Sequence, residues 1–182
     1  MSRHLGFLLE SGRQSAVILL EISGPPWPVQ LPCKAVSKIK YLELIDALCR
    51  LTGCAQPGVI SDGGALQIDD VAFSLLHDAQ VDNTLLYIYA DFGVLPRGRE
   101  LPAALALLEA NLFLYSGAAP AFAITPGTER VTMAHHCALT QIDAPDLHAL
   151  LIDMAAKARQ WRSDHFLDPA TNPFQLHGSD RR

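Results

Sequence analysis

Residues 101–115 read LPAALALLEANLFLY, and this stretch decides which fold and assembly we expect the chain to form. Its large apolar residues recur at steps of four, three, four and three, the heptad spacing of a helix that packs along another helix. These residues are Leu101, Leu105, Leu108, Leu112 and Tyr115. Ala104, Leu107 and Leu114 form a second apolar stripe, so the helix needs cover on nearly every side. We therefore expect a homodimer whose interface contains the five heptad residues.

The segments on either side of this helix have the periodicities of further helices and strands. Apolar residues at helical spacing precede Gly53, alternating and β-branched runs follow it, and Asp143 is placed to cap a last helix. The expected elements are a helix over 39–51, strands over 66–69, 71–76 and 84–90, the helix over 101–115, strands over 121–125 and 130–138, and a helix over 144–162. The order α-β-β-β-α-β-β-α predicts an α+β fold, a twisted antiparallel sheet with helices packed on it.

The composition limits the function classes that fit. The chain has 182 residues, of which 49% are apolar and 18% charged, and its formal net charge is −5. No apolar run reaches the ~18 residues that a membrane-spanning helix needs, and an acidic chain repels phosphate backbones. We therefore expect neither membrane insertion nor nucleic-acid binding. The 4 cysteines have no paired spacing, which indicates reduced thiols and a cytoplasmic protein.

The two ends of the chain differ from its middle. Residues 1–37 contain short apolar runs, a proline-rich break at 24–28 and no signal peptide, so we interpret them as a weakly ordered or non-native extension. Residues 38–162 hold the expected domain, and residues 163–182 are expected to form a mobile tail. Residues 1–38 carry four Lys/Arg against two Asp/Glu, so the expected domain is more acidic than the whole chain.

Several short motifs follow one another in the order of the expected elements. The first helix reads YLELIDALCRLTG over 41–53, LQID over 66–69 leads into VAFSL over 71–75, and residues 85–95 read LLYIYADFGVL. The most specific motif is LLEANL over 107–112, which is followed by a glycine turn and two strands. These motifs and the order of elements resemble the type III secretion chaperone family typified by the Tir chaperone.

This resemblance, which covers residues 39–162, implies a small, acidic, cytoplasmic, homodimeric chaperone that is not an enzyme and needs no cofactor. It implies that the chaperone holds the N-terminal region of a secreted effector as an extended, secretion-competent chain. It also suggests the ATPase of the secretion apparatus as a further partner. An extended partner adds a strand to a sheet edge and places alternate side chains in apolar grooves. We expect an effector-binding groove formed by exposed members of the set Tyr41, Leu42, Ile45, Leu48, Phe73 and Leu75.

Two other classes of protein remain open. An adaptor or regulatory protein of the same fold would bind a cytoplasmic protein instead of a secreted one, and an enzyme would need a site that no familiar motif marks. His135, His136 and Cys137 invite a metal site, but neighbouring residues of a strand point to opposite faces. Two ligands on one face are too few for a structural zinc site. We predict neither a metal ligand nor a catalytic residue.

Overall fold

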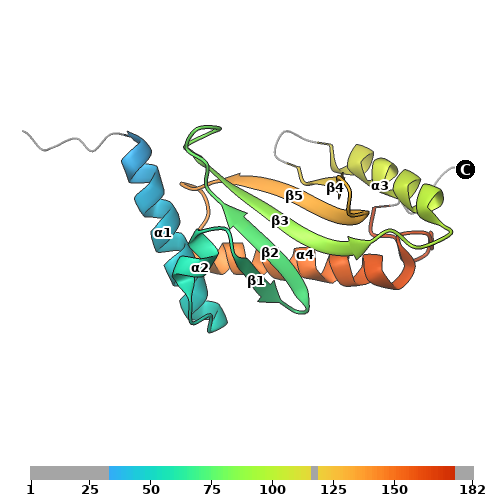
Figure 1. The fold of residues 1–182 in the computed structure, drawn as a ribbon, viewed down its shortest axis with the longest axis horizontal. Coiled ribbons are helices and arrows are strands. Elements are labelled where there is room, and N and C mark those ends of the chain that lie inside the picture. The colour runs from blue at the N-terminus through green and yellow to red at the C-terminus, as the bar shows by residue number, and fades with distance from the viewer. Residues whose placement is uncertain (1–32, 116–118, 175–182) are drawn as a thin grey trace, which may run out of the picture. The chain divides into compact units, whose positions relative to one another are not determined.

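A computed structural model of the chain describes residues 33–115 and 119–174, which all belong to one compact unit. Its elements (Figure 1) are α1 (Cys33–Thr52), α2 (Pro57–Ser61), β1 (Ala65–Ile68), β2 (Val71–Leu76), β3 (Leu85–Val94), α3 (Glu100–Leu114), β4 (Ala121–Thr125), β5 (Arg130–Ala138) and α4 (Ala144–Asp164). The predicted α+β fold is confirmed, and α2 is an addition to the predicted order. With only 5 residues, α2 is too short to show a helical period in the sequence.

The five strands form one antiparallel sheet in the order β1-β2-β3-β5-β4. α3 lies between β3 and β4 in sequence, and β5 returns to fill the place between these two strands. The register of the central pair β3 and β5 shifts between Asp91 and Gly93, where Gly93 has a φ of 101°. A bulge of this kind bends the strand and increases its twist. The sheet has two edges, β1 and β4.

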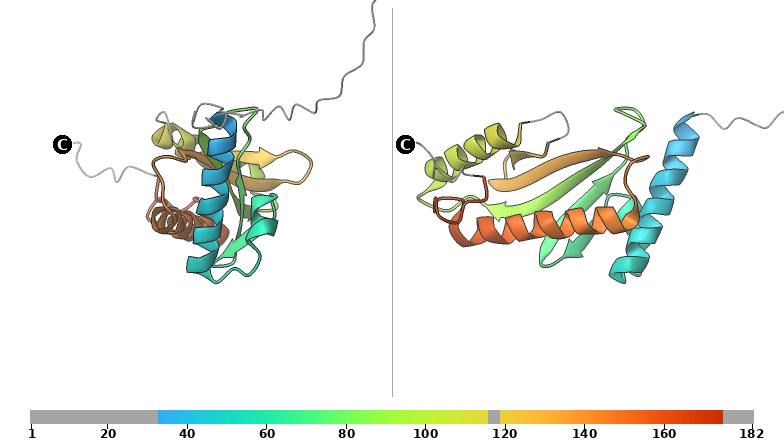
Figure 2. Two further views of the ribbon diagram at one scale, coloured as in Figure 1. Left: turned by 90° about the vertical axis from the view of Figure 1, so that its left-hand side faces the viewer. Right: turned by 180° about the vertical axis from the view of Figure 1, so that it is seen from behind.

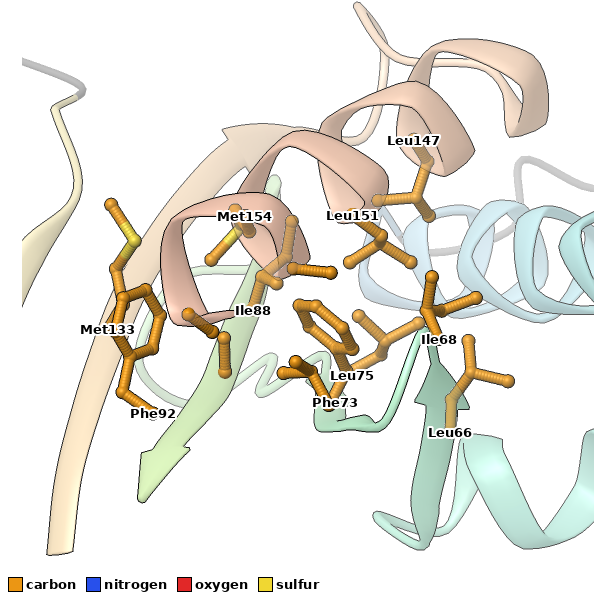
Figure 3. Close-up of a cluster of buried hydrophobic side chains, with 14 of the residues drawn as sticks. Leu66, Ile68, Phe73, Leu75, Ile88, Phe92, Met133, Leu147, Leu151 and Met154 are labelled. Atoms are coloured by element: carbon orange, nitrogen blue, oxygen red, sulfur yellow. The ribbon is translucent and has the colours of Figure 1, made fainter. Parts of the chain in front are cut away.

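α4 lies across one face of the sheet, and α1 packs against α4 at one end of that face (Figure 2). Alternate residues of β2 and β3 point toward α4 and are buried, as the two-residue period of a strand requires. Figure 3 shows Phe73, Leu75 and Ile88 of the sheet beside Leu151 and Met154 of α4. The apolar face of α4 is therefore the face that covers the sheet.

Polar contacts fasten the C-terminal end of α4 to the sheet. Arg159 Nη1 donates to Asp69 Oδ2 in the β1–β2 turn, at 2.8 Å. Arg162 donates through its three guanidinium nitrogens to the carbonyl of Asp70 and to two carbonyls of β3, at distances of 2.8–3.2 Å. Asp69 and Asp70 both have positive φ, 46° and 65°, as a tight two-residue hairpin turn requires. One face of the turn is therefore held by α4.

The first helix begins earlier than predicted. α1 starts at Cys33, so residues 33–37 belong to the domain and not to the N-terminal extension. Its first two turns have no buried residue among positions 36–40, and a helix without a buried face shows no amphipathic pattern in the sequence. The rest of the predicted extension, residues 1–32, lies outside the described residues, as do the expected glycine turn at Gly117 and residues 175–182.

The described part of the segment predicted to be a mobile tail, residues 163–174, packs onto the core. α4 continues to Asp164, and Phe166 and Phe174 are buried against Phe122 of β4, with ring centroids 5.8 and 5.6 Å from the Phe122 ring. His165 and Phe166 both have positive φ and turn the chain back onto the core. A reversal made by two non-glycine residues has no sequence signature, so the loop-like composition of this segment did not indicate the packing.

Candidate functional site

α3 turns its large side chains outward and its small ones toward the rest of the molecule. The predicted interface residues Leu101, Leu105, Leu108, Leu112 and Tyr115, called the heptad face below, expose between 50% and 87% of their surface. The buried residues of the helix are Ala103, Ala106, Leu107 and Ala110. A contiguous apolar surface of this kind marks a site of protein interaction. The structure thus leaves the heptad face uncovered in the single chain.

One polar residue of α3 reaches the edge strand β4. Asn111 Nδ2 donates to the carbonyl oxygen of Phe122 at 3.1 Å, and the Phe122 N–H donates to Asn111 Oδ1 at 2.6 Å. An apolar cavity of about 260 Å³ opens beside this pair. It is lined by Ala104, Leu107, Leu108, Asn111, Phe122, Ala123 and Ile124. The cavity borders the heptad face through Leu108.

The set predicted to form the effector-binding groove belongs mostly to the core. Five of its six members are buried in the single chain, namely Tyr41, Ile45, Leu48, Phe73 and Leu75. Leu42 exposes 42% of its surface. Leu42, Ile45 and Leu48 follow one another at steps of three residues, and each step falls about 60° short of a full helical turn. The side chains therefore rotate from solvent at Leu42 to the core at Leu48.

Tyr41 shows how these buried residues act. Its hydroxyl donates to the carbonyl oxygen of Leu75 at 2.9 Å and lies 3.2 Å from that of Ser61. Burial raises the pKa of Tyr41 to about 12, and the negative charge of Asp62 adds to the rise. The hydroxyl therefore stays protonated and ties α1 to β2, so Tyr41 fixes the position of the helix.

The exposed part of α1 holds apolar residues that the sequence interpretation did not assign to binding. These residues are Val36 and Ile39, which are exposed and precede the buried Tyr41. Together with the exposed Leu42 they form a stripe at three-residue spacing. Lys38 Nζ lies 4.9 Å from the centre of the Tyr41 ring. The signal that could have identified this stripe is its three-residue spacing, which drifts away from the buried face.

The β1 edge of the sheet is open within the described ranges. The two-residue turn makes Ile68 and Val71 a hydrogen-bonded pair, so the backbone groups of Ala65 and Gln67 point away from β2. No other part of the described chain forms a hydrogen bond with these outward groups. A cavity of about 260 Å³ adjoins this edge, lined by Cys54, Ala55, Gln56, Val59, Ile60 and Ala65. The edge can accept an extended chain.

The sheet face opposite α4 is largely polar. Arg130 pairs with Asp91, with Nε donating to Oδ1 at 3.2 Å, and the hydroxyls of Thr125 and Thr132 lie 3.0 Å apart. Tyr89 is the exposed aromatic residue among them. This face lacks the apolar character of the α3 surface and of the α1 stripe, so we do not assign a binding role to it.

Burial favours the neutral forms of His135 and Cys137 of β5 and of Cys49 of α1. Burial lowers the pKa of His135, and the nearby His136 lowers it further. Burial raises the pKa of Cys137 to about 11, and it raises the pKa of Cys49 to about 11 with help from Cys54. A protonated thiol is a poor nucleophile and a poor metal ligand. Within residues 33–115 and 119–174, no three His, Cys, Asp or Glu side chains are grouped to hold a metal ion.

Two solved structures have a similar fold. A chain of the HopA1–SchA chaperone–effector complex matches with a TM-score of 0.54 and 21% identity, over 70% of this chain and 97% of that chain. A chain from the crystal structure of the Yersinia pestis type III secretion chaperone SycH with a stable fragment of YscM2 matches with a TM-score of 0.50 and 16% identity, over 65% and 97%. The fold is that of the type III secretion chaperones.

The sequence also places the chain in one family within this class. Residues 43–162 match the model of the Tir chaperone protein (CesT) family, and the chain belongs to that family. The match confirms the resemblance inferred from the motifs. None of the curated proteins compared with the chain matches it. Among the described helices, none is both long enough and apolar enough to cross a membrane.

Proposed function

We propose that this protein is a type III secretion chaperone that binds the N-terminal region of a secreted effector in an extended, secretion-competent form. The open β1 edge carries the proposal, because the outward backbone groups of Ala65 and Gln67 offer an extended chain the hydrogen bonds of one more strand. Membership of the family supports it, and so does the similarity to a chain of a chaperone–effector complex.

Apolar surfaces beside this edge and on α1 supply contacts for the side chains of the bound effector. An added strand places every second side chain on the same face, and the cavity beside Val59 and Ile60 can accept one of them. The exposed stripe Val36, Ile39 and Leu42 of α1 supplies a second apolar contact. Of the six residues predicted for the groove, Leu42 touches the effector directly, and the five buried ones keep α1 and β2 in position.

We further propose that the chaperone works as a homodimer joined through the heptad face. A second copy presents the same apolar surface, so a two-fold axis lets each face cover the other. The exposed leucines gain burial in this way, and burial of apolar surface is the main driving force of association. Each dimer then offers two β1 edges to one effector chain.

This function belongs in the bacterial cytoplasm, where the effector is held before secretion, and it is followed by transfer to the ATPase of the secretion apparatus. The chaperone itself catalyses no reaction and uses no cofactor. Binding to the chaperone competes with aggregation of the effector. Because no covalent bond changes, the effector is released chemically unchanged.

Co-expression with candidate effectors tests the proposal. The tagged chain is produced with secreted proteins encoded near its gene, and bound proteins are digested and identified by mass spectrometry. We expect one secreted protein to bind, with its N-terminal region protected from protease. Capture of a protein that is not secreted would favour an adaptor instead.

A proline substitution tests the β1 edge. Gln67→Pro removes an outward N–H and leaves the β1–β2 hydrogen bonds intact, since Gln67 faces Ala72 of β2 as a non-hydrogen-bonded pair. We expect the variant to lose the effector while its circular dichroism spectrum is retained, and Gln67→Ala to bind normally. Unchanged effector binding by Gln67→Pro would contradict the β1 site.

A further inference from the structure

The two edges of the sheet differ in what their outward backbone groups contact. In β4, Ala121, Ala123 and Thr125 form the hydrogen-bonded pairs with β5, so the outward groups are those of Phe122 and Ile124. The preceding residue, Pro120, has no N–H to donate. β4 therefore has only two residues with which a further strand could pair through both backbone groups.

The Asn111 side chain occupies one of these two residues completely. Its amide group donates to the Phe122 carbonyl and accepts from the Phe122 N–H, at 3.1 and 2.6 Å. A neighbouring strand would form the same two bonds with Phe122, so the Asn111 amide takes the place of that strand. Within residues 33–115 and 119–174, Ile124 is the one β4 residue whose outward groups have no hydrogen-bond partner, and one residue cannot hold a strand in register.

We propose that Asn111 is the positioning residue that closes the β4 edge and so restricts strand addition to β1. Its two hydrogen bonds pin α3 alongside β4, and the closed edge faces neither an effector strand nor the sheet of another copy. Asn111 is one of the two polar residues of α3 between Leu101 and Tyr115, and its place in the LLEANL motif follows from this role.

The physical need for a closed edge comes from the geometry of assembly. If both edges were open, β1 of one copy could pair with β4 of the next, and this contact is heterologous and does not close on itself. Repetition of such a contact builds open-ended chains of molecules, which is the hazard that exposed edge strands present. Closing one edge removes the hazard and leaves the other edge free for a partner.

The Asn111→Ala variant tests the proposal in the full chain. We expect amide hydrogen exchange at Phe122 to become about tenfold faster, because its two hydrogen bonds are lost. We also expect species larger than any that the unchanged protein forms, growing with concentration in sedimentation velocity. Asn111→Asp keeps the acceptor for the Phe122 N–H, so exchange at Phe122 should stay slow. Glu109→Ala changes the other polar residue between Leu101 and Tyr115 and should alter neither measurement.

A second substitution separates edge pairing from simple loosening of α3. Ile124→Pro removes the last outward N–H of β4 without breaking a bond to β5. The double variant Asn111→Ala/Ile124→Pro should return to the size distribution of Ile124→Pro alone. Large species that persist in the double variant, or their absence in Asn111→Ala, would overturn the proposal. The assembly measurement does not depend on effector binding, so it distinguishes this inference from the proposed function.

Discussion

α3 and α4 place their large side chains in opposite directions. α4 buries Leu147, Leu151 and Trp161, whereas α3 exposes its heptad face and buries three alanines and Leu107. The cause is position. α4 lies over a sheet face, where strand side chains meet it along its length, and α3 lies beside the edge strand β4 (Figures 1 and 2). A small-residue face lets α3 approach β4 closely and leaves its leucines for a partner.

The difference teaches that an apolar stripe indicates a face that will be buried, without indicating by what. On α4 the covering surface belongs to the same chain, so the stripe contributes to the stability of the fold. On α3 the covering surface belongs, in our proposal, to a second copy, so the stripe contributes to assembly. Substitutions on the two helices should therefore change different measurements.

The largest effect is expected for Trp161→Ala on α4. The Trp161 side chain is fully buried, and truncating a buried tryptophan lowers the free energy of unfolding by about 3–5 kcal/mol through lost contacts and a cavity. Urea unfolding followed by circular dichroism measures this loss. A loss below ~1 kcal/mol would show that α4 is less tightly packed than the comparison requires.

Leu108→Asp on α3 should break the dimer and spare the fold. A charge at the centre of an apolar interface weakens self-association by about 2 kcal/mol or more, roughly thirtyfold in Kd. Sedimentation equilibrium measures the change, and the circular dichroism spectrum should not change. The matched control is Ile152→Asp, because Ile152 is an exposed apolar residue of α4. If Ile152→Asp weakens the dimer and Leu108→Asp does not, the interface lies on α4 and the proposed α3 interface is contradicted.

A smaller difference is expected at the first residues of the two helices. Asp143 caps α4 by accepting the Asp146 N–H at 2.9 Å, whereas Arg99 makes no side-chain cap for α3. Replacing Asp143 with Ala should lower the free energy of unfolding by about 1 kcal/mol. Arg99→Ala, at the equivalent position of α3, should leave it unchanged within error. Chemical denaturation of both variants checks the contrast.

The smallest expected effect concerns pH and the sheet face that α4 covers. His135 shares that face with Met133, and burial together with His136 lowers its pKa. The unfolded chain then binds a proton more readily than the folded one, so stability falls as the pH drops below the ordinary histidine pKa of ~6.5. His135→Gln should reduce the stability lost between pH 7 and pH 5, measured by urea unfolding. Equal losses in both proteins would contradict this assignment.

Much of the fold could be predicted from the sequence because local patterns carry it. Residues 84–90 have the aromatic and β-branched content of a strand, and Asp143 is placed as a helix cap, and both predictions agree with the structure. The differences occur where the local sequence pattern does not indicate whether a residue is buried. Residues 165–174 have loop composition but pack onto Phe122, and Ile45 and Leu48 look like a continuation of the exposed Leu42.

The candidate site was predictable to a smaller degree. The five heptad residues were predicted as a dimer interface from their spacing, and all five are exposed in the single chain, so the interface itself stays a prediction. The effector-binding set was assigned largely to core residues, because helical spacing does not show which side of the helix faces the sheet. The open β1 edge and the closed β4 edge were not predicted, since they depend on strand order and on the contact between Asn111 and Phe122.

By itself, the sequence determined the element types, their order, the apolar faces and the family, because each depends on side chains that are close together along the chain. The tertiary structure alone decided which apolar face is core, which is surface and which sheet edge is open. Those outcomes depend on contacts between residues far apart in sequence, such as Tyr41 with Leu75 and Arg162 with Asp70. These contacts form, and contribute to stability, only once the chain has folded.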